Sequence, residues 1–187
     1  MLNYGTIENC MNTGNITMTN NASTWGGSYQ KSGGIAGQNE GNIYNCVNTG
    51  TITTQSLVDV SNQQSNLSGI ITSRLMNNAQ IKNCYWLKDC LSRGSSTSNQ
   101  VVYFKSSGTS YANSFPDTAT VEGCGYFESF AAGAALTAGN ADSCKSSQTL
   151  SYGTTLIDAL NGYVNANPDK ELKQWQTAED GTITLSF

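Results

Sequence analysis

The sequence predicts an all-β fold, a parallel β-helix of about four coils. The first observation behind this prediction is an internal repeat, because residues 41–52 match residues 5–16 at eight of twelve positions. The second is that apolar residues come in short bursts, separated by Gly and Asn roughly every eight or nine residues, a spacing too short for helices. Three short strands bring the chain back near its start, so each repeat can lie on the previous one, about 4.8 Å further along the axis.

The residue before each repeated cysteine predicts a bend in the chain. Ile43 and Cys46 are three residues apart and cannot both point inward along a straight strand, whose side chains alternate. A residue with positive φ makes such a bend, and Asn and Gly tolerate that conformation best. The repeat places there Asn9, Asn45, Asn83 and Gly123. We expect the asparagines to form a structural ladder, with amide side chains hydrogen-bonded along the axis.

Four of the six cysteines occupy one position of the repeat and are expected to stack as small apolar core residues. They are Cys10, Cys46, Cys84 and Cys124. Neighbouring strands lie ~4.8 Å apart, further than the roughly 3.8 Å between the Cβ atoms of a disulfide, so bonding within this ladder needs distortion. Cys90 and Cys144 fall outside the repeat, and the sequence does not decide whether they take part in a disulfide.

Residues 1–150 are expected to form the β-helix repeats, with loop insertions. The first insertion, residues 20–32, carries two aromatic side chains, Trp25 and Tyr29. Later polar stretches at residues 55–66 and 88–119 predict further loops, the second around one irregular strand.

Residues 151–187 are expected to form a C-terminal cap, a helix and a β-hairpin, within the same structural domain. Apolar residues recur with helical spacing from residue 156 to 164, Thr155 is a suitable N-cap, and Pro168 ends the helix. Residues 173–177 and 182–187 then predict a hairpin. We expect this cap to cover the last coil, whose open strand edges would otherwise bind another chain.

The second repeat contains two short motifs in a fixed order. Residues 34–37 read Gly-Ile-Ala-Gly, and residues 41–46 read Gly-Asn-Ile-Tyr-Asn-Cys. This order resembles the GLUG motif of bacterial cell-surface proteins, a Gly-Leu-x-Gly element that precedes a Gly-x-Ile-x-Asn-Cys-Tyr-like segment. The resemblance covers roughly residues 4–127 and is weaker outside the second repeat. It implies a right-handed β-helix on a secreted or surface-anchored protein, and it implies no catalytic residues.

Composition argues against two kinds of partner. The net charge is −4, and Lys31 is the only basic residue before Arg74, so the first part of the chain has no basic patch for nucleic acid. No apolar run approaches the roughly 20 residues of a membrane span, and residues 1–4 lack the features of a signal peptide. We expect no nucleic-acid partner and no direct membrane insertion. We also expect this chain to be part of a longer exported protein that works outside the cell or at its surface.

The absence of His removes Ser-His and Cys-His nucleophile pairs and the side chain best suited to proton transfer near neutral pH. No Cys-x-x-Cys pair occurs either, so we expect no metal and no cofactor. Carboxylates remain, but Glu8 and Glu122, which share an outward position of the repeat, would lie ~14 Å apart, too far for a glycosidase pair. No catalytic residues are therefore expected.

The favoured function is a non-catalytic, adhesin-like surface module that binds a glycan or a protein, or that acts as a spacer. The alternative is a polysaccharide-processing β-helix enzyme, a carboxylate-based hydrolase or lyase whose acids meet through loops. Ice binding is a third hypothesis, because Thr-x-Thr patterns occur at residues 17–19 and 51–53. For a sugar ligand, aromatic rings that stack on its apolar faces are the first candidates, namely Trp25, Tyr29 and Tyr44.

Overall fold

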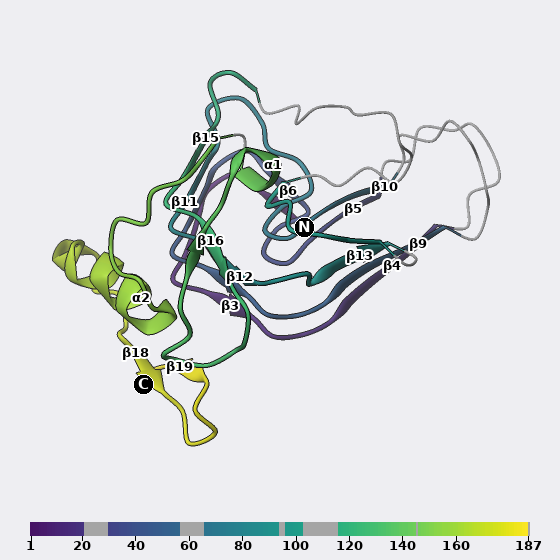
Figure 1. The fold of residues 1–187 in the computed structure, drawn as a ribbon. Coiled ribbons are helices and arrows are strands. Elements are labelled where there is room, and N and C mark those ends of the chain that lie inside the picture. Colours follow the sequence, from purple (N-terminus) through teal and green to yellow (C-terminus); the bar gives the residue numbers. More distant parts are fainter. Residues whose placement is uncertain (21–29, 57–65, 94–95, 103–115, 145, 187) are drawn as a thin grey trace.

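The computed structural model describes residues 1–20, 30–56, 66–93, 96–102, 116–144 and 146–186, and its strands form four repeats (Figure 1). Repeat 1 contains β1 (Leu2–Asn3), β2 (Thr6–Glu8), β3 (Met11–Asn12) and β4 (Ile16–Asn20). Repeat 2 contains β5 (Gln30–Gly33), β6 (Gln38–Asn39), β7 (Asn42–Tyr44), β8 (Val47–Asn48) and β9 (Ile52–Ser56). Repeat 3 contains β10 (Asn66–Gly69), β11 (Gln80–Lys82), β12 (Tyr85–Leu87) and β13 (Leu91–Arg93). Repeat 4 contains β14 (Ser96–Ser98), β15 (Thr120–Glu122) and β16 (Gly125–Phe127). The C-terminal part contains β17 (Thr137–Ala138), α1 (Ala141–Cys144), α2 (Leu156–Asn165), the 3₁₀ helix η1 (Pro168–Lys170), β18 (Trp175–Thr177) and β19 (Ile183–Leu185).

Successive repeats pair through parallel strands at equivalent positions. Three sheets run across the repeats in the orders β2-β7-β11-β15, β3-β8-β12-β16 and β4-β9-β13, and shorter parallel pairs join β1 to β6 and β5 to β10. Ile43 lies opposite Ile7 on one side and Ile81 on the other, and Ile81 lies opposite Val121. The strand register therefore follows the sequence repeat, and the fold is mostly β-structure with parallel sheets.

Strands lie in two stretches where the sequence predicts loops: β13 and β14 fall within residues 88–119, where one irregular strand was expected, and β5 falls within the first insertion. The insertion was expected to run to residue 32, but Gln30–Gly33 forms β5 and pairs in parallel with β10. Parallel pairing uses backbone groups, so a polar sequence does not prevent it.

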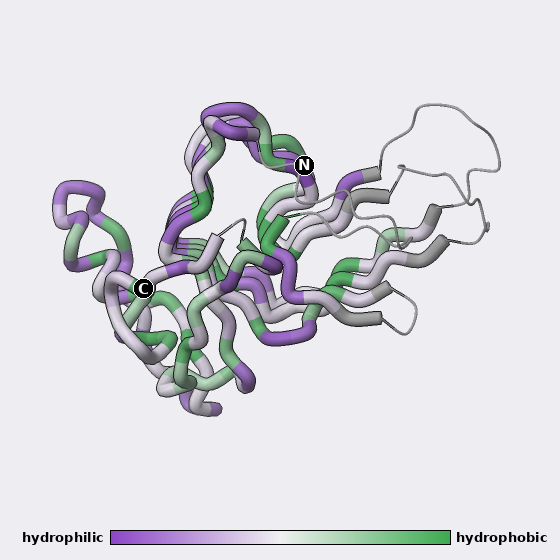
Figure 2. Tube along the Cα trace, turned by 45° about the horizontal axis from the view of Figure 1, so that its top comes forward, coloured by the Kyte–Doolittle hydropathy of each residue, from purple (hydrophilic) through white to green (hydrophobic). Residues whose placement is uncertain are grey.

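The inward side chains of the repeats form one apolar core. Ile43, Ile52, Ile81, Trp86 and Leu91 are fully buried there. Figure 2 shows that hydrophobic stretches of neighbouring repeats lie beside one another. Burial of an Ile or Leu side chain contributes about 1.5 to 3 kcal/mol, so this core is a main source of stability.

Each repeat bends at the residue that precedes the repeated cysteine. The φ angles of Asn9, Asn45 and Asn83 are 56°, 50° and 52°, and that of Gly123 is 65°. These are the left-handed conformations that the sequence predicts. Asn45 Nδ2 donates one hydrogen bond to Asn9 Oδ1 over 2.8 Å and another to the Leu160 carbonyl oxygen over 3.2 Å. The bend is therefore tied both to the preceding repeat and to the C-terminal segment.

The cysteines beside these bends are not all buried. Cys46, Cys84 and Cys124 are fully buried, as expected of core residues. Cys10 is exposed, because within the described residues no further repeat covers that side of repeat 1. The expectation that Cys10 is a buried core residue is therefore wrong.

Cys90 and Cys144 are also buried, and all six cysteines are free thiols. Asn48 Nδ2 donates to Cys90 Sγ over 3.4 Å, and burial raises the pKa of the Cys90 thiol to about 12. Cys144 belongs to the same core as Cys124. Both thiols are thus inaccessible, and Cys90 stays protonated at neutral pH.

We expect a thiol reagent to modify Cys10 alone in the native protein. The other five thiols are at most 4% exposed, and they should react only after the protein opens or unfolds. Peptide mass spectrometry measures the modified positions, with a urea-unfolded sample as the control in which all six react. Modification of Cys46 or Cys84 without unfolding would contradict their place in the core.

The C-terminal segment folds into the predicted helix and hairpin. α2 begins after Thr155, whose side chain accepts a hydrogen bond from the Asp158 N–H. β18 pairs with β19 in antiparallel orientation, with Trp175 opposite Leu185. The local sequence signals for this segment are therefore correct.

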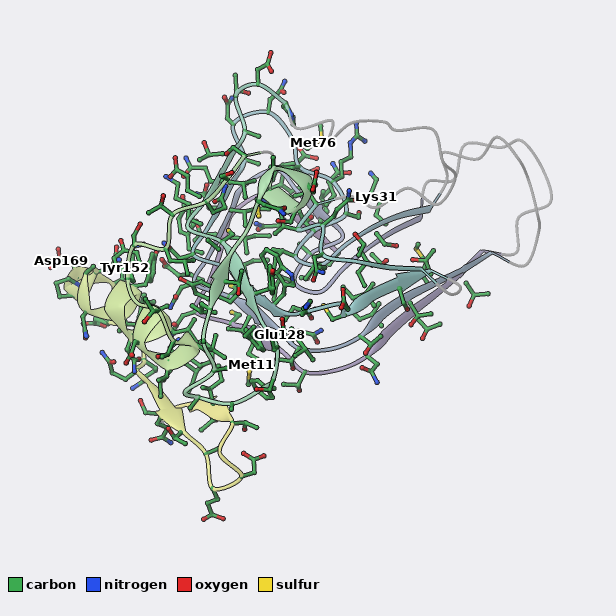
Figure 3. The ribbon with its side chains drawn as sticks, in the orientation of Figure 1. Met11, Lys31, Met76, Glu128, Tyr152 and Asp169 are labelled. Atoms are coloured by element: carbon green, nitrogen blue, oxygen red, sulfur yellow. The ribbon has the colours of Figure 1, made fainter. Side chains whose placement is uncertain are left out.

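The location of this segment differs from the predicted cap over the last coil. α2 and the hairpin lie beside the stacked strands (Figure 1), where Val47, Tyr85 and Phe127 form a second core with Leu160 and Trp175. Figure 3 shows Met11 of repeat 1 on the same side, and its side chain packs against this second core. Residues 151–187 thus cover the side of the repeats and not their end, because the outer face of the β3-β8-β12-β16 sheet is itself apolar and must be buried.

The end of the repeats is covered by other elements. β17 pairs in antiparallel orientation with β16, and β14 pairs in the same way with β13. The Val101 N–H donates to the Ser143 carbonyl oxygen over 3.0 Å, which holds α1 against this end. Cys144 of α1 is fully buried in the first core. Two of the three long sheets thus end in an antiparallel strand.

Candidate functional site

The outward side chains of β2, β7, β11 and β15 form a polar surface, which we call the polar face. Residues of a strand alternate between its two sides, so the central residue of each of these strands points into the core and its neighbours point outward. The polar face consists of Thr6, Glu8, Asn42, Tyr44, Gln80, Lys82, Thr120 and Glu122. The strand register arranges these side chains in two rows of four.

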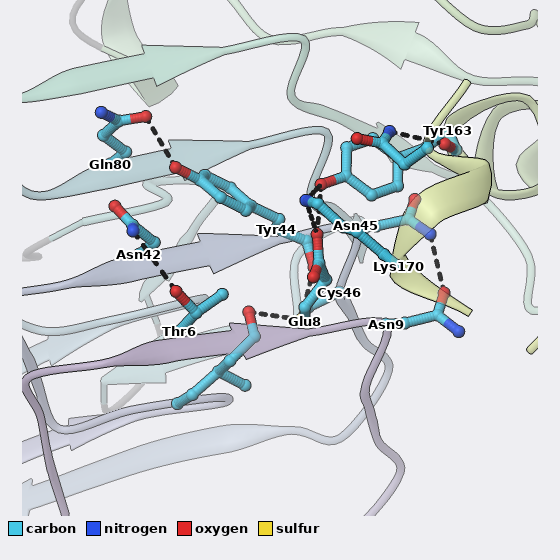
Figure 4. A network of polar contacts seen from close by, with 12 residues as sticks. Thr6, Glu8, Asn9, Asn42, Tyr44, Asn45, Cys46, Gln80, Tyr163 and Lys170 are labelled. Carbon is cyan, nitrogen blue, oxygen red and sulfur yellow. Dashed lines mark hydrogen bonds and ion pairs between the residues drawn. The ribbon is translucent and has the colours of Figure 1, made fainter. Parts of the chain in front are cut away.

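Hydrogen bonds run along the polar face from repeat to repeat. Asn42 Nδ2 donates to Thr6 Oγ1 over 3.3 Å, and the Tyr44 hydroxyl donates to Gln80 Oε1 over 2.7 Å (Figure 4). Side chains in contact across strands restrict one another's rotamers. The face therefore presents its amide and hydroxyl groups in fixed positions.

A charged cluster lies where the polar face meets the C-terminal segment. Lys170 Nζ lies 2.5 Å from Glu8 Oε1 and 3.1 Å from the Tyr163 hydroxyl oxygen, and this hydroxyl also donates to Glu8 (Figure 4). Lys170 Nζ also lies 5.4 Å from the ring centre of Tyr44 and 5.4 Å from that of Tyr163. Both distances are within the range of a cation–π interaction.

This cluster mainly positions the C-terminal segment. Burial and the hydrogen bond to Glu8 raise the pKa of Tyr163, so its hydroxyl stays a neutral donor. The side chain of Lys170 is 39% exposed, so the ion pair contributes no more than about 1 kcal/mol. Sequence reasoning missed the cluster, because Tyr163 and Lys170 are 155 and 162 residues from Glu8 and no local pattern links them.

The structure places one of the three predicted ligand-binding residues. Trp25 and Tyr29 lie outside the described residues. Tyr44 is half-buried on the polar face, and burial raises the pKa of its hydroxyl. Lys170 Nζ lies over its ring, so an aromatic side chain and a cation lie together at this point of the polar face.

The polar face does not bring two carboxylates together. Glu8 and Glu122 lie on the first and fourth strands of the sheet, ~14 Å apart at the usual strand spacing. Glu122 is instead paired with Lys82, whose Nζ lies 3.1 Å from Glu122 Oε2. Because a glycosidase needs carboxyl groups about 5 to 9.5 Å apart, these two residues do not form such a pair.

The two Thr-x-Thr stretches behind the ice-binding hypothesis are out of register in the sheet, because Thr19 lies opposite Gln55 and Thr51 precedes β9. Thr17 of β4 lies opposite Thr53 of β9, but the next residue in this row is Ser92 of β13. Thr53 Oγ1 and Ser92 Oγ are hydrogen-bonded over 3.2 Å. The Thr-x-Thr pattern therefore does not continue into the third repeat.

Metal clusters and membrane-spanning helices are both absent from the part of the chain that the structure describes. No group of three or more His, Cys, Asp or Glu side chains lies close enough there to hold a metal ion. The helices in these ranges are too short or too polar to cross a membrane.

Comparison with known protein families places one motif in the chain. Residues 29–53 match the GLUG motif. This stretch includes β5 to β8, with Asn42 and Tyr44 of the polar face and the bend at Asn45. No curated protein and no solved structure matches the chain. The chain is a GLUG-motif protein, with the motif in its second repeat.

Proposed function

We propose that the chain is a right-handed β-helix and a non-catalytic module of an extracellular or cell-surface protein, which binds a glycan or a protein surface through its polar face. The observation that carries this proposal is the registered double row of outward side chains on β2, β7, β11 and β15. Amides and hydroxyls both donate and accept hydrogen bonds, as do the hydroxyls of a sugar. Fixed rows of such groups favour recognition of an extended polar ligand.

The charges of the polar face indicate the class of ligand. Glu8 is paired with Lys170, and Glu122 is paired with Lys82. Because each charge has a partner of opposite sign, the face presents little net charge. A neutral or weakly charged glycan is therefore the preferred ligand within this proposal.

The proposed location outside the cell rests on the match to the GLUG motif and on the resemblance of the second repeat to the repeats of bacterial cell-surface proteins. The low charged fraction, 12% of residues, fits a solenoid that uses amides and hydroxyls on its surface. Single contacts of this kind give weak sites, so useful adhesion would come from many copies on one cell.

Tyr44→Ala is expected to weaken binding of a neutral glycan by about tenfold, because the substitution removes an aromatic ring from the site. Calorimetry against a panel of neutral and acidic glycans measures this change. Tyr44→Phe keeps the ring and loses only the hydroxyl, so it should bind close to wild type. Thr17→Ala, on a different sheet, is the control for general damage to the fold.

Three results would overturn the proposed function. If glycans bind Tyr44→Ala and wild type equally, the polar face is not the site. If the wild-type protein releases reducing sugar or unsaturated products from a polysaccharide, the enzymatic alternative holds. Failure to bind any glycan or surface protein would favour a spacer.

A further inference from the structure

Repeat 1 ends three sheets on the same side of the molecule. β2, β3 and β4 are terminal strands of sheets that continue through repeats 2 and 3. Their core side chains are incompletely covered, since Ile7 is half-buried where Ile43 is fully buried, and Cys10 is exposed where Cys46 is fully buried. The large hydrophobic side chains that are exposed among the described residues also belong to this repeat, namely Met1, Leu2 and Tyr4.

Two glycines at this edge leave room that no described residue fills. A Cβ on Gly41 of repeat 2 would lie 2.1 Å from the Gly5 carbonyl oxygen. A Cβ on Gly50 would lie 2.0 Å from the Gly14 carbonyl oxygen, so repeat 2 needs glycine at both positions to approach repeat 1. A Cβ on Gly5 would meet nothing within 4 Å, and one on Gly14 would meet only Asn12 Oδ1 at 3.6 Å. Repeat 1 thus carries glycine where the close approach of another repeat would require it.

Backbone groups at this edge follow the pattern of the repeat interfaces. The N–H groups of Asn42 and Val47 donate to carbonyl oxygens of repeat 1 over 2.8 and 2.9 Å, and the same bonds recur between repeats 3 and 2. The equivalent N–H groups of repeat 1 belong to Thr6 and Met11. They lie on strands with no neighbour on that side in the described ranges. A parallel strand from another repeat would supply the carbonyl oxygens that match them.

The predicted asparagine ladder is formed between Asn45 and Asn9 but not between Asn83 and Asn45, because Asn45 Oδ1 has no hydrogen-bond partner among the described residues. The step from Asn45 to Asn9 can be extended at this edge. Asn45 gives one amide hydrogen to Asn9 and the other to the Leu160 carbonyl oxygen. Asn9 gives one to the Lys173 carbonyl oxygen over 2.9 Å. The second amide hydrogen of Asn9 is equivalent, in the repeat, to the hydrogen that Asn45 donates to Asn9. An asparagine in a preceding repeat would therefore continue the ladder.

We propose that this edge binds a polypeptide segment that carries the chain's own repeat, paired with β2, β3 and β4 in parallel and in the register that joins repeats 1 and 2. Repeats 1 and 2 are already joined by parallel strands in this register. The edge of repeat 1 has the features that this interface uses, namely glycines at the points of close approach, outward backbone N–H groups and the side-chain amide of Asn9. A second copy cannot stack there head to tail through all three sheets, because β14 and β17 close two of them at its other end. The occupant is therefore a segment whose repeat strands are themselves free.

The test adds one repeat to the full chain. In the extended chain, residues 5–40 are followed directly by residues 5–187. Residues 37–40 of the added copy then take the place of residues 1–4, to which they are equivalent in the repeat. The added copy also carries Cys10→Ala. If the added repeat docks, labelling of the original Cys10 should slow by about tenfold or more, since it would then require local opening. The midpoint of thermal unfolding should also rise in a single transition. A chain with the same 36 added residues in scrambled order should label Cys10 at the original rate.

Gly5→Ala tests whether protection of Cys10 comes from the close approach of the added repeat. In the original chain this change should leave the unfolding midpoint and Cys10 labelling unaltered, because the new Cβ meets no atom. In the extended chain the same change, at the original Gly5, should restore fast labelling of Cys10. Equal labelling rates in the original and extended chains, or destabilisation of the original chain by Gly5→Ala, would overturn the proposal.

A second copy as the occupant gives a different result. Cys10 of the original chain would then become protected as protein concentration rises, and light scattering would detect a dimer. That outcome would replace the proposed segment with a copy of the same chain.

Discussion

Trp175→Ala is expected to lower the free energy of unfolding by about 3 to 5 kcal/mol, the usual cost of deleting a large buried ring. Trp175 is 2% exposed and lies in the second core, and its indole N–H donates to Asn9 Oδ1 over 2.7 Å. The Asn161 side chain also accepts a hydrogen bond from the backbone N–H of Trp175 over 2.7 Å and donates one to the backbone carbonyl oxygen of Trp175 over 2.9 Å. Loss of the ring should therefore weaken the hairpin and repeat 1 together, as measured by urea unfolding.

Two further variants separate the causes of this loss. Trp175→Phe keeps an apolar ring but removes the N–H from Asn9, and it should cost about 1 to 2 kcal/mol. Thr177→Ala changes an exposed residue of the same strand and should stay within about 0.5 kcal/mol of wild type. A Trp175→Ala protein as stable as Thr177→Ala would show that the hairpin does not hold repeat 1.

Asn45→Val is expected to cost about 3 to 5 kcal/mol, the combined effect of backbone strain and the loss of two buried hydrogen bonds. Asn45 has a φ of 50°, a conformation in which a β-branched side chain is strained. The substitution also removes the donors to Asn9 Oδ1 and to the Leu160 carbonyl oxygen, in a site with 0% exposure. The shift in the urea midpoint measures the cost.

Asn45→Gly is the matched comparison, because glycine accepts positive φ but lacks the amide. It should cost about 1 to 2 kcal/mol, the contribution of the lost hydrogen bonds. The difference between the Val and Gly variants then reports the strain, reduced by the entropy that glycine adds to the unfolded chain. Equal midpoints for the two variants would mean that the positive φ at residue 45 carries no cost.

The repeated part of the fold was predictable because one short pattern recurs. Ile43 and Ile81 occupy equivalent positions in the sequence and lie opposite each other in the sheet. Asn9, Asn45 and Asn83 predict the bend because few residue types tolerate its φ. These signals depend only on residues close in the sequence, and each copy of the repeat contains them.

The lateral position of the C-terminal segment was not predicted, although a signal for it exists. Val47 and Tyr85 directly follow cysteines that face the first core, so they point to the other side of the sheet. Apolar side chains on both sides of a strand indicate that both faces are covered. This signal is weak in strands of two or three residues, where alternation is hard to distinguish from an apolar run.

The candidate site was predicted only in part. Tyr44 lies on the polar face, and the row of Glu8, Tyr44, Lys82 and Glu122 follows from the repeat. The contacts of Glu8 with Tyr163 and Lys170 could not be predicted, because they depend on how the C-terminal segment packs against repeat 1.

The contact between the C-terminal hairpin and repeat 1 has a consequence for the order of folding. Neighbouring repeats pair over 36 to 40 residues, so they can assemble one after another as the chain leaves the ribosome. Asn9, however, receives its partners Lys173 and Trp175 from 164 and 166 residues further along the chain. Contacts of such long range are slow to form, because a long loop must close first. Within this chain, repeat 1 is thus synthesised before the other repeats but gains its last partners only after Lys173 and Trp175 have been made.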